Sequence, residues 1–182
     1  KVYIIEDLIL KYKKILKFLK KTNIPKLIIY NTLTHKQYYV SFPETFFSIE
    51  VPSIYNQDST IPYLFIEYSS MKTPMIIYKL DMSKNKLLIQ KQDKFQSFKS
   101  ANYYTGYFQI SSQLYITYIY HKQCITLDGK KTYPCLLHGY GAYGHTLDES
   151  FSSSIISLVD RGFLYCIAHI RGSSFQGKQW YK

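Results

Sequence analysis

The apolar positions of the chain follow two kinds of spacing. Up to about residue 120, apolar side chains alternate with polar ones over short runs such as 114–120, which is typical of strands with one buried face. Beyond residue 130, two uninterrupted apolar runs lie on either side of a segment with helical spacing. Uninterrupted runs of this length are typical of strands buried on both faces. The pattern therefore predicts many short strands first and a strand–helix–strand unit last.

Short strands separated by turns account for most of the first 120 residues. Turn residues such as Pro43-Glu44 and the polar stretch 53–58 separate the apolar runs. The strands predicted from these runs are 26–30, 37–42, 46–51, 63–68, 75–81, 86–91, 103–110 and 114–120. Short strands at this spacing suit the blades of a β-propeller. The polar stretch 83–100 indicates a domain boundary.

The segment Leu8–Lys21 supports two interpretations. Its apolar residues fall on one helical face with lysines opposite, as in a basic amphipathic helix that binds a membrane surface or a partner. Leu8, Leu10 and Tyr12 also alternate as they would in a strand. Both interpretations stay open on these residues alone, and the strand pattern of the runs that follow favours the strand.

The C-terminal part of the chain is predicted to form a strand, a glycine-rich loop, a helix and a second strand. Cys135–Leu137 and Phe163–Ile170 have the length and composition of buried strands. Asp148 and Ser150 are candidate N-caps for the helix, and Gly162 is placed to end it with a positive φ. Two such strands joined by a helix form a βαβ unit, whose strands are parallel.

Three interpretations compete for the loop Gly139–Gly144. Its sequence GYGAYG matches G-x-G-x-x-G, a dinucleotide-binding motif in which the helix starts inside the motif. Polar residues 145–150 separate this loop from the helical pattern, and the second strand ends in His169-Ile170-Arg171 instead of an acidic residue, which disfavours a dinucleotide-binding βαβ unit. Such a loop also supplies an oxyanion donor in α/β-hydrolases, where His138–Gly141 has the expected position. A tight turn without chemistry is the third alternative.

Four segments of the chain carry a resemblance to a known family. They are PCLLHGYGAYG, SLVDRGFLYCIAHIRG and GKQWY in the C-terminal part, and YSSMKTPMIIYKLDM at 68–82. These segments resemble the prolyl oligopeptidase family of serine peptidases, in particular its oligopeptidase B or protease II branch. Long segments in the same order are more specific than one glycine motif.

The resemblance implies a fold class of β plus α/β, in which the end of a β-propeller is followed by the first strands and helix of an α/β-hydrolase domain. It places the C-terminal part of the propeller at 1–82 and the N-terminal part of the hydrolase (peptidase S9) domain at 83–182. Enzymes of this branch are serine proteases that cleave short peptides after Arg or Lys with a Ser-Asp-His triad. The implied partners are short basic peptides for a full-length form, and the remainder of the enzyme.

Tyr140 is the candidate catalytic residue that the resemblance assigns in this chain. It matches the family tyrosine whose hydroxyl helps to hold the oxyanion. The triad has no counterpart, because the nucleophile elbow of an α/β-hydrolase follows this point and no G-x-S-x-G occurs in the sequence. We therefore expect an internal fragment of a serine oligopeptidase that is inactive alone. A non-catalytic remnant and a basic binding module are the alternatives.

Two positions depart from the family pattern. His138 stands where the family usually has tyrosine, and Ser173–Phe175 stands where the family has glycines and then glutamate. Glycine tolerates a positive φ, whereas serine and phenylalanine adopt one at a cost of about 1 kcal/mol or more each. We therefore expect a loop under relaxed constraint, with Phe175 as a simple loop anchor as the alternative.

Charge and composition narrow the classes of partner. The net charge of +11 would suit nucleic acid or a membrane surface, but the lysines are scattered and no nucleic-acid-binding motif accompanies them, so we expect neither partner. No apolar stretch reaches the roughly 18 residues that cross a membrane. Cys124, Cys135 and Cys166 lack C-x-x-C spacing and two fall in runs predicted to be buried, as in a cytoplasmic protein with reduced cysteines. The five histidines lack metal-ligand spacing, so we expect no metal and no cofactor.

Overall fold

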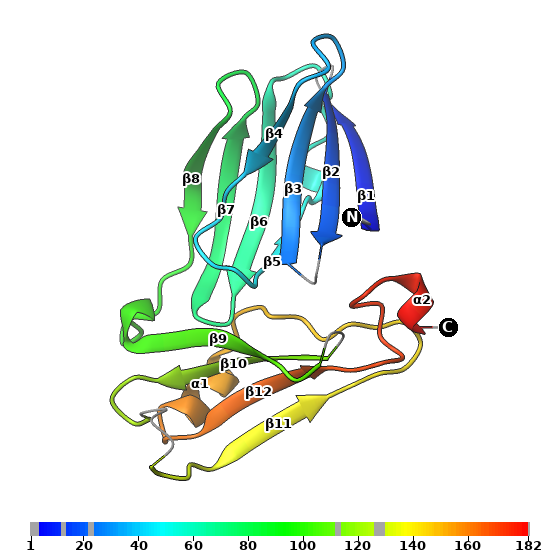
Figure 1. Ribbon diagram of the computed structural model, residues 1–182. Coiled ribbons are helices and arrows are strands. Elements are labelled where there is room, and N and C mark those ends of the chain that lie inside the picture. The colour runs from blue at the N-terminus through cyan, green and yellow to red at the C-terminus, as the bar shows by residue number, and fades with distance from the viewer. Residues whose placement is uncertain (1–3, 12–13, 22–23, 112–113, 126–129, 182) are drawn as a thin grey trace. The chain divides into compact units, whose positions relative to one another are not determined.

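The computed structural model of the protein describes residues 4–11, 14–21, 24–111, 114–125 and 130–181 (Figure 1). The chain divides into two compact units. The first comprises Lys1–Ser69 and Met75–Asp93, and the second comprises Ser70–Pro74 and Lys94–Lys182. The strand Lys86–Gln92 belongs to the first unit and pairs there with the strand before it. The domain assignments 1–82 and 83–182 stay predictions.

The first unit begins with a four-stranded antiparallel sheet (Figure 1). Its strands follow one another in the order β1 (Ile4–Lys11), β2 (Lys14–Lys21), β3 (Ile24–Asn31) and β4 (Gln37–Val40). The segment Leu8–Lys21 is therefore extended on both sides of residues 12–13, which lie outside the described residues. The strand interpretation is confirmed there, and the basic amphipathic helix is wrong for the residues that the structure describes.

A second four-stranded sheet completes the first unit. Its order is β5 (Ser48–Glu50), β6 (Tyr63–Ser70), β7 (Thr73–Asp81) and β8 (Lys86–Gln92). Along β6 every second side chain is buried, as expected for a strand with one face in the core. The hydrophobic core of the unit is formed by Leu27, Ile29, Phe47, Leu64, Ile66, Tyr68, Ile76, Tyr78, Leu80 and Met82. Because β3 of the first sheet and β6 and β7 of the second all contribute residues to this core, the core joins the two sheets.

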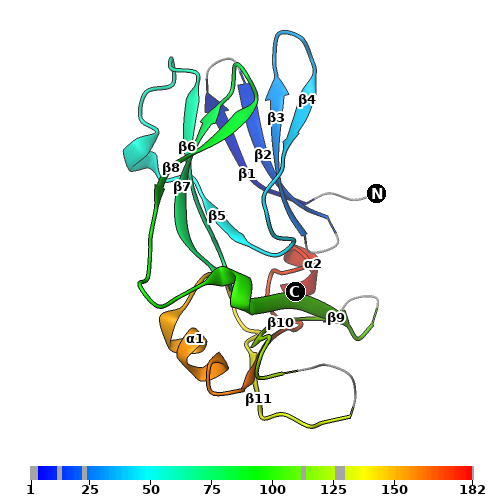
Figure 2. The same cartoon turned by 90° about the vertical axis from the view of Figure 1, so that its left-hand side faces the viewer.

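The second unit is built on a mixed four-stranded sheet with a helix on one face (Figures 1 and 2). The strand order is β11 (Cys135–Gly139), β12 (Leu164–His169), β10 (Tyr115–His121) and β9 (Tyr103–Gln109). The strands β11 and β12 are parallel, and the other pairs are antiparallel. The helix α1 (Ser153–Val159) connects the two parallel strands. The predicted βαβ unit is therefore confirmed.

The core of the second unit lies between α1 and the sheet. It consists of Met71, Tyr103, Ile119, Ile156, Val159, Tyr165 and Ile167. Tyr165 and Ile167 alternate along β12, and Ile119 of β10 is paired with Tyr165, so these three residues share the face that α1 covers. A short second helix, α2 (Lys178–Tyr181), was not predicted and buries Trp180.

Two details of the βαβ unit differ from the sequence-based expectation. The strand β11 was predicted to be buried, yet all five of its residues are exposed, because β11 is the edge strand of the described sheet. The helix begins after Ser152, not after Asp148 or Ser150, and the Ser152 side chain makes no capping bond. The prediction for Gly162 is confirmed, since this residue follows the helix with φ of 89°.

Candidate functional site around the glycine-rich loop

The candidate site lies where the two parallel strands end. The strand β11 ends at Gly139 and leads directly into Tyr140, and β12 ends at His169 and leads into Arg171. The backbone register pairs Gly139 with Ala168, so both strands end at the same edge of the sheet. The carboxyl ends of parallel strands are where α/β proteins place their ligands. We call residues 139–144 the glycine loop and residues 171–177 the anchor loop.

The glycine loop and the anchor loop are joined by backbone hydrogen bonds. The Gly144 amide donates to the Gly172 carbonyl at 3.0 Å, and the Ser174 amide donates to the Gly144 carbonyl at 3.1 Å. Gly172 has φ of 95°, and a Cβ atom on it would lie 1.9 Å from the Gly141 carbonyl oxygen. Gly141 is equally constrained, since its Cβ would lie 2.2 Å from the Arg171 carbonyl oxygen. The close approach of the two loops therefore requires glycine on both sides.

Tyr140 stands at the start of the glycine loop with its ring partly open to solvent. The residue is 42% exposed. Its hydroxyl makes no hydrogen bond to any of the described residues, so this donor is available to a ligand. Tyr143 in the same loop is 79% exposed and has φ of 54°, an uncommon conformation for a residue with a large side chain. The loop thus presents two tyrosines outward on a backbone that the anchor loop holds.

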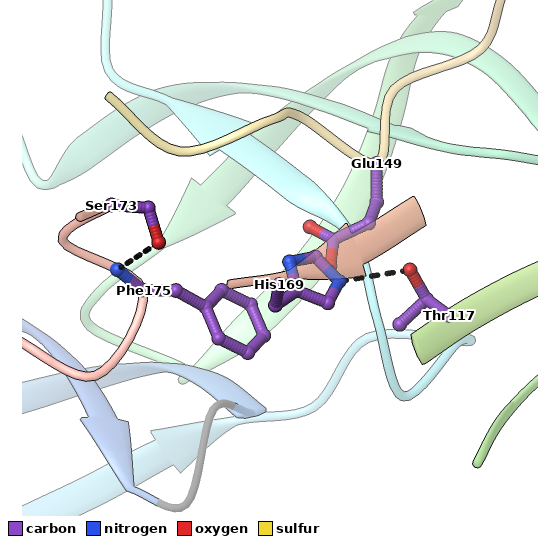
Figure 3. Close-up of polar contacts among 5 residues, drawn as sticks. All are labelled: Thr117, Glu149, His169, Ser173 and Phe175. Atoms are coloured by element: carbon purple, nitrogen blue, oxygen red, sulfur yellow. Dashed lines mark hydrogen bonds and ion pairs between the residues drawn. The ribbon is translucent and has the colours of Figure 1, made fainter. Parts of the chain in front are cut away.

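A buried polar cluster lies directly behind the anchor loop (Figure 3). His169, at the end of β12, is 2% exposed, and its Nε2 atom lies 2.9 Å from Thr117 Oγ1 and 3.1 Å from Glu149 Oε1. The Phe175 ring stacks on the His169 ring, with centroids 3.7 Å apart and planes 9° from parallel. His169 Nε2 thus lies between the Thr117 hydroxyl and the Glu149 carboxylate, whereas His169 Nδ1 and Glu149 Oε1 have no hydrogen-bond partner among the described residues. The cluster fixes Phe175, and through Phe175 it fixes the anchor loop.

None of the residues Ser173–Phe175 adopts a positive φ, so the cost that serine and phenylalanine would incur there does not arise. In the anchor loop the residues with positive φ are Gly172 and Gly177, and the four residues between them avoid that region. Ser173 instead donates through Oγ to the Ile170 carbonyl at 2.8 Å and accepts from the Phe175 amide at 3.4 Å. The loop is therefore held in place by local hydrogen bonds and by the buried Phe175 ring, which supports the loop-anchor alternative.

His138, the other departure from the family pattern, faces the helix side of the sheet. Its Nδ1 atom lies 3.2 Å from the Tyr165 hydroxyl. Burial of the Tyr165 ring raises the pKa of that hydroxyl, so Tyr165 stays protonated and can donate to His138. The histidine thereby satisfies a buried hydroxyl one residue before the glycine loop begins.

The geometry of the glycine loop does not favour dinucleotide binding. The first residue of α1 is Ser153, so the helix begins well after Gly144 and its N-terminus is not part of the motif. Among the residues that the structure describes, no three His, Cys, Asp or Glu side chains gather as metal ligands. Within the same residues no helix is both long and apolar enough to cross a membrane.

Comparison with known proteins identifies the family in which this arrangement occurs. The family model described as prolyl oligopeptidase family matches residues 149–182, which include α1, β12 and the anchor loop. The chain is 30% identical over 148 residues to dipeptidyl aminopeptidase BI of Pseudoxanthomonas mexicana, and 25% identical over 150 residues to Protease 2 of Moraxella lacunata. Each match covers 79% of this chain. The chain belongs to the prolyl oligopeptidase family.

Solved structures agree with this membership over nearly the whole chain. Oligopeptidase B from Trypanosoma brucei, which is 27% identical, superposes with a TM-score of 0.86 over 98% of this chain and 26% of that protein. Oligopeptidase B from Leishmania major gives 0.85 over 99% of this chain. The expected fold class, the end of a β-propeller followed by the first strands and helix of an α/β-hydrolase domain, is confirmed.

The matches cover only part of each relative. The chain spans 20% of the length of dipeptidyl aminopeptidase BI and 21% of that of Protease 2. Each of these two relatives therefore contains much sequence that has no counterpart in these 182 residues.

The structure adds residues to the candidate site that the sequence did not single out. Glu149 and Thr117 were not predicted to meet His169, because the three residues lie on different elements. The signal that was available is the acidic pair Asp148-Glu149 before the serine-rich segment 150–154. Phe175 was considered, but only as a departure from a pattern, and its stacking partner could not be named from spacing.

Proposed function

We propose that the chain is part of a serine oligopeptidase that hydrolyses short peptides after Arg or Lys, and that the Tyr140 hydroxyl donates a hydrogen bond to the oxyanion of the transition state. The observation that carries this proposal is the position of Tyr140 in a prolyl oligopeptidase family chain. It follows the parallel strand β11, and its hydroxyl has no hydrogen-bond partner among the described residues. The proposed substrates are short basic peptides, and the proposed compartment is the cytoplasm, without a metal or cofactor.

An oxyanion donor must be held in place before the reaction begins. Its benefit comes from a dipole that is already oriented where negative charge develops, so that no reorganisation is needed during the step. The glycine loop meets this condition on one side, because Gly144 and the anchor loop exchange two backbone hydrogen bonds. The buried stack of Phe175 on His169 holds the anchor loop in turn. Tyr140 therefore projects from a loop that is supported at its far end.

The nucleophile and its partners must come from outside these residues. The 182 residues contain no G-x-S-x-G, the turn that carries the serine in α/β-hydrolases. We propose that the remainder of the enzyme supplies the Ser-Asp-His triad and completes the propeller. Tyr140 would then be the contribution of this part of the chain to the active site.

Replacing Tyr140 by phenylalanine in the whole enzyme tests the proposal. Tyr140→Phe keeps the ring and removes the donor, so we expect kcat with an Arg-amide reporter to fall about 100- to 1,000-fold with little change in KM. Tyr143→Phe is the matched control, because Tyr143 lies in the same loop and is more exposed, and its kcat should stay near that of the wild type. An unchanged kcat for Tyr140→Phe, or a loss confined to thermal stability, would show that Tyr140 has a packing role and not a catalytic one.

A basic binding module is the second candidate, and the net charge of +11 favours it. Such a module would bind anionic lipid or nucleic acid and would lose this binding as salt screens the charges. The segment Leu8–Lys21 is extended in the described residues, so this binding would not use an amphipathic helix.

A further inference from the structure

We propose that His169 is a positioning residue for Tyr140, because its buried ring holds two segments that both support the glycine loop. Glu149 comes from the segment that follows the glycine loop, and its Oε1 atom lies 3.1 Å from His169 Nε2. Phe175 comes from the anchor loop and stacks on the face of the same ring, with centroids 3.7 Å apart. Figure 3 shows both side chains beside His169. The proposal rests on the proposed function of Tyr140 as the oxyanion donor.

The His169 ring is itself held in place by the sheet. It lies at the end of β12 and is 2% exposed. Its Nε2 atom lies 2.9 Å from the Thr117 hydroxyl, and Thr117 is a buried residue of the neighbouring strand β10. A ring that is packed on its edge and on its face has few other orientations open to it in a close-packed interior. The ring therefore gives both segments a fixed point that belongs to the sheet.

The segment 145–151 is the first connection between His169 and the glycine loop. Thr146 Oγ1 lies 3.2 Å from the Ser174 hydroxyl of the anchor loop, and Leu147 packs against the core between α1 and the sheet. Glu149 follows two residues later and is buried against His169. The chain that leaves the glycine loop is therefore held at successive residues, and the contact of Glu149 with the imidazole is the one that ties it to the end of β12.

The anchor loop is the second connection. Phe175 is 1% exposed on the His169 ring, and the amide of Ser174 beside it donates to the Gly144 carbonyl at 3.1 Å. The Gly144 amide donates in turn to the Gly172 carbonyl at 3.0 Å. All of these contacts join described residues of the second unit, and none of them requires a residue from elsewhere.

Tyr140 is held between two points that both refer to the end of β12. Gly139, just before it, pairs with Ala168, the residue before His169. Gly144, at the far end of the loop, is held by the two connections. An oxyanion donor acts only where the negative charge develops, and a misplacement of about 1 Å can cost about 100-fold in rate. Loosening either connection should therefore lower kcat through Tyr140.

Kinetics of the whole enzyme with an Arg-amide reporter test the proposal. Replacing His169 itself would leave the Glu149 carboxylate buried without the imidazole and would destabilise the fold, so each connection is cut separately. Glu149→Ala removes the first, and Phe175→Leu removes the flat ring of the second while keeping apolar bulk. We expect each variant to lower kcat roughly tenfold or more with little change in KM.

Two controls separate positioning from folding. Rates are expressed per active site titrated with a serine-directed reagent, so that a loss of folded enzyme does not lower the measured kcat. Asp148→Ala is the matched variant, because it truncates the neighbouring carboxylate, which is exposed. Its kcat should stay near that of the wild type.

Double variants show whether the effect passes through Tyr140. In Tyr140→Phe the donor is already absent, so adding Glu149→Ala or Phe175→Leu should lower kcat by no more than about twofold further. Effects that are independent of Tyr140 would instead multiply.

The outcomes distinguish this proposal from the proposed function. If Tyr140→Phe lowers kcat but Glu149→Ala or Phe175→Leu does not, or if their losses multiply with that of Tyr140→Phe, the positioning role is wrong and the oxyanion role stands. Fewer titratable sites with an unchanged kcat per site would also overturn the positioning role, because the cluster would then only stabilise the fold. If Tyr140→Phe leaves kcat unchanged, the oxyanion role is wrong and the positioning role is wrong with it.

Discussion

Tyrosine is abundant in this chain, with twenty residues, and each buried ring has a hydroxyl that needs a partner. In the second unit Tyr103 donates to Asp160 Oδ1 at 2.6 Å, linking the start of β9 to the end of α1. In the first unit the Tyr68 hydroxyl donates to Glu44. Burial raises the pKa of each of these tyrosines, and the carboxylate that accepts the hydrogen bond raises it further. At the residue scale, each of these tyrosines therefore combines a packed aromatic ring with a carboxylate that accepts the hydrogen bond of its hydroxyl.

Removing the Tyr103 hydroxyl should weaken the second unit. Tyr103→Phe loses a hydrogen bond to a charged group, and we expect the free energy of unfolding at pH 7 to fall by about 1.5 kcal/mol. The pKa of Tyr103 is raised in the folded state, so above about pH 10 the unfolded chain releases this proton while the folded chain keeps it. The wild type therefore loses stability as pH rises, and its advantage over Tyr103→Phe should shrink. Urea unfolding at pH 7 and at alkaline pH measures both effects.

Tyr104→Phe is the control for this prediction. Tyr104 is the next residue of β9, points to the opposite face and is exposed. Its substitution should change stability at pH 7 little. A Tyr103→Phe variant as stable as Tyr104→Phe would show that the bond to Asp160 contributes nothing.

At the scale of elements, the two loops that follow β11 and β12 depend on each other. The glycine loop has few buried apolar side chains of its own, and its far end is held by hydrogen bonds to the anchor loop. The anchor loop is held by the Phe175 ring and by its own turn. Disturbing the point where their backbones meet should release both loops and leave the sheet intact.

Gly172→Ala disturbs this point. The new Cβ atom would lie 1.9 Å from the Gly141 carbonyl oxygen, and the residue has φ of 95°, so backbone must move. We expect hydrogen exchange of the Gly144 and Ser174 amides to accelerate roughly tenfold or more, which corresponds to a loss of about 1.4 kcal/mol in local stability. Exchange of the β10 and β12 amides should change far less.

Gly162→Ala is the matched control, because Gly162 also has a positive φ, of 89°, but a Cβ there would meet only Cys124 Cβ at 3.9 Å. The Gly162→Ala substitution should lower the free energy of unfolding by about 1–2 kcal/mol because of the backbone conformation alone. It should leave the Gly144 amide protected from hydrogen exchange. Equal exchange at Gly144 in the two variants would contradict the contact between the loops.

At the scale of the whole molecule, the chain contains two units with separate hydrophobic cores. One core joins the two sheets of the first unit, and the other packs α1 on the mixed sheet. The family's chemistry requires a nucleophile that these 182 residues do not contain in its usual motif. The chain spans about a fifth of the length of the curated relatives it matches.

The 182 residues alone are therefore expected to hydrolyse no peptide. Purified chain incubated with an Arg-amide reporter should give no turnover above buffer, because an oxyanion donor without a nucleophile forms no acyl intermediate. Turnover that survives purification and is blocked by a serine-directed reagent would contradict this expectation. Retention on anionic lipid or nucleic acid that falls between low and high salt would instead favour the basic binding module.

Much of the local structure could be predicted because it depends on neighbours in the sequence. The short run 63–68 between turn residues predicted a strand, and its alternate residues Leu64, Ile66 and Tyr68 are buried. The apolar spacing before Gly162 predicted the helix and its end, since glycine is favoured where φ is positive. Tyr140 as a site residue came from the family pattern, and the structure adds the supported loop and a hydroxyl without a hydrogen bond to any described residue.

The sequence by itself determined which segments are strands, where the βαβ unit lies and which loop carries the candidate chemistry, because these follow from periodicity, glycine placement and motif. Only the tertiary structure decided that β11 is the exposed edge of the described sheet, that Cys135 lies against Cys166, and that Phe175 stacks on His169. Burial and contact depend on what packs on each face and edge. Spacing along the chain shows which residues share a face of an element, but it does not show which other elements pack against that face.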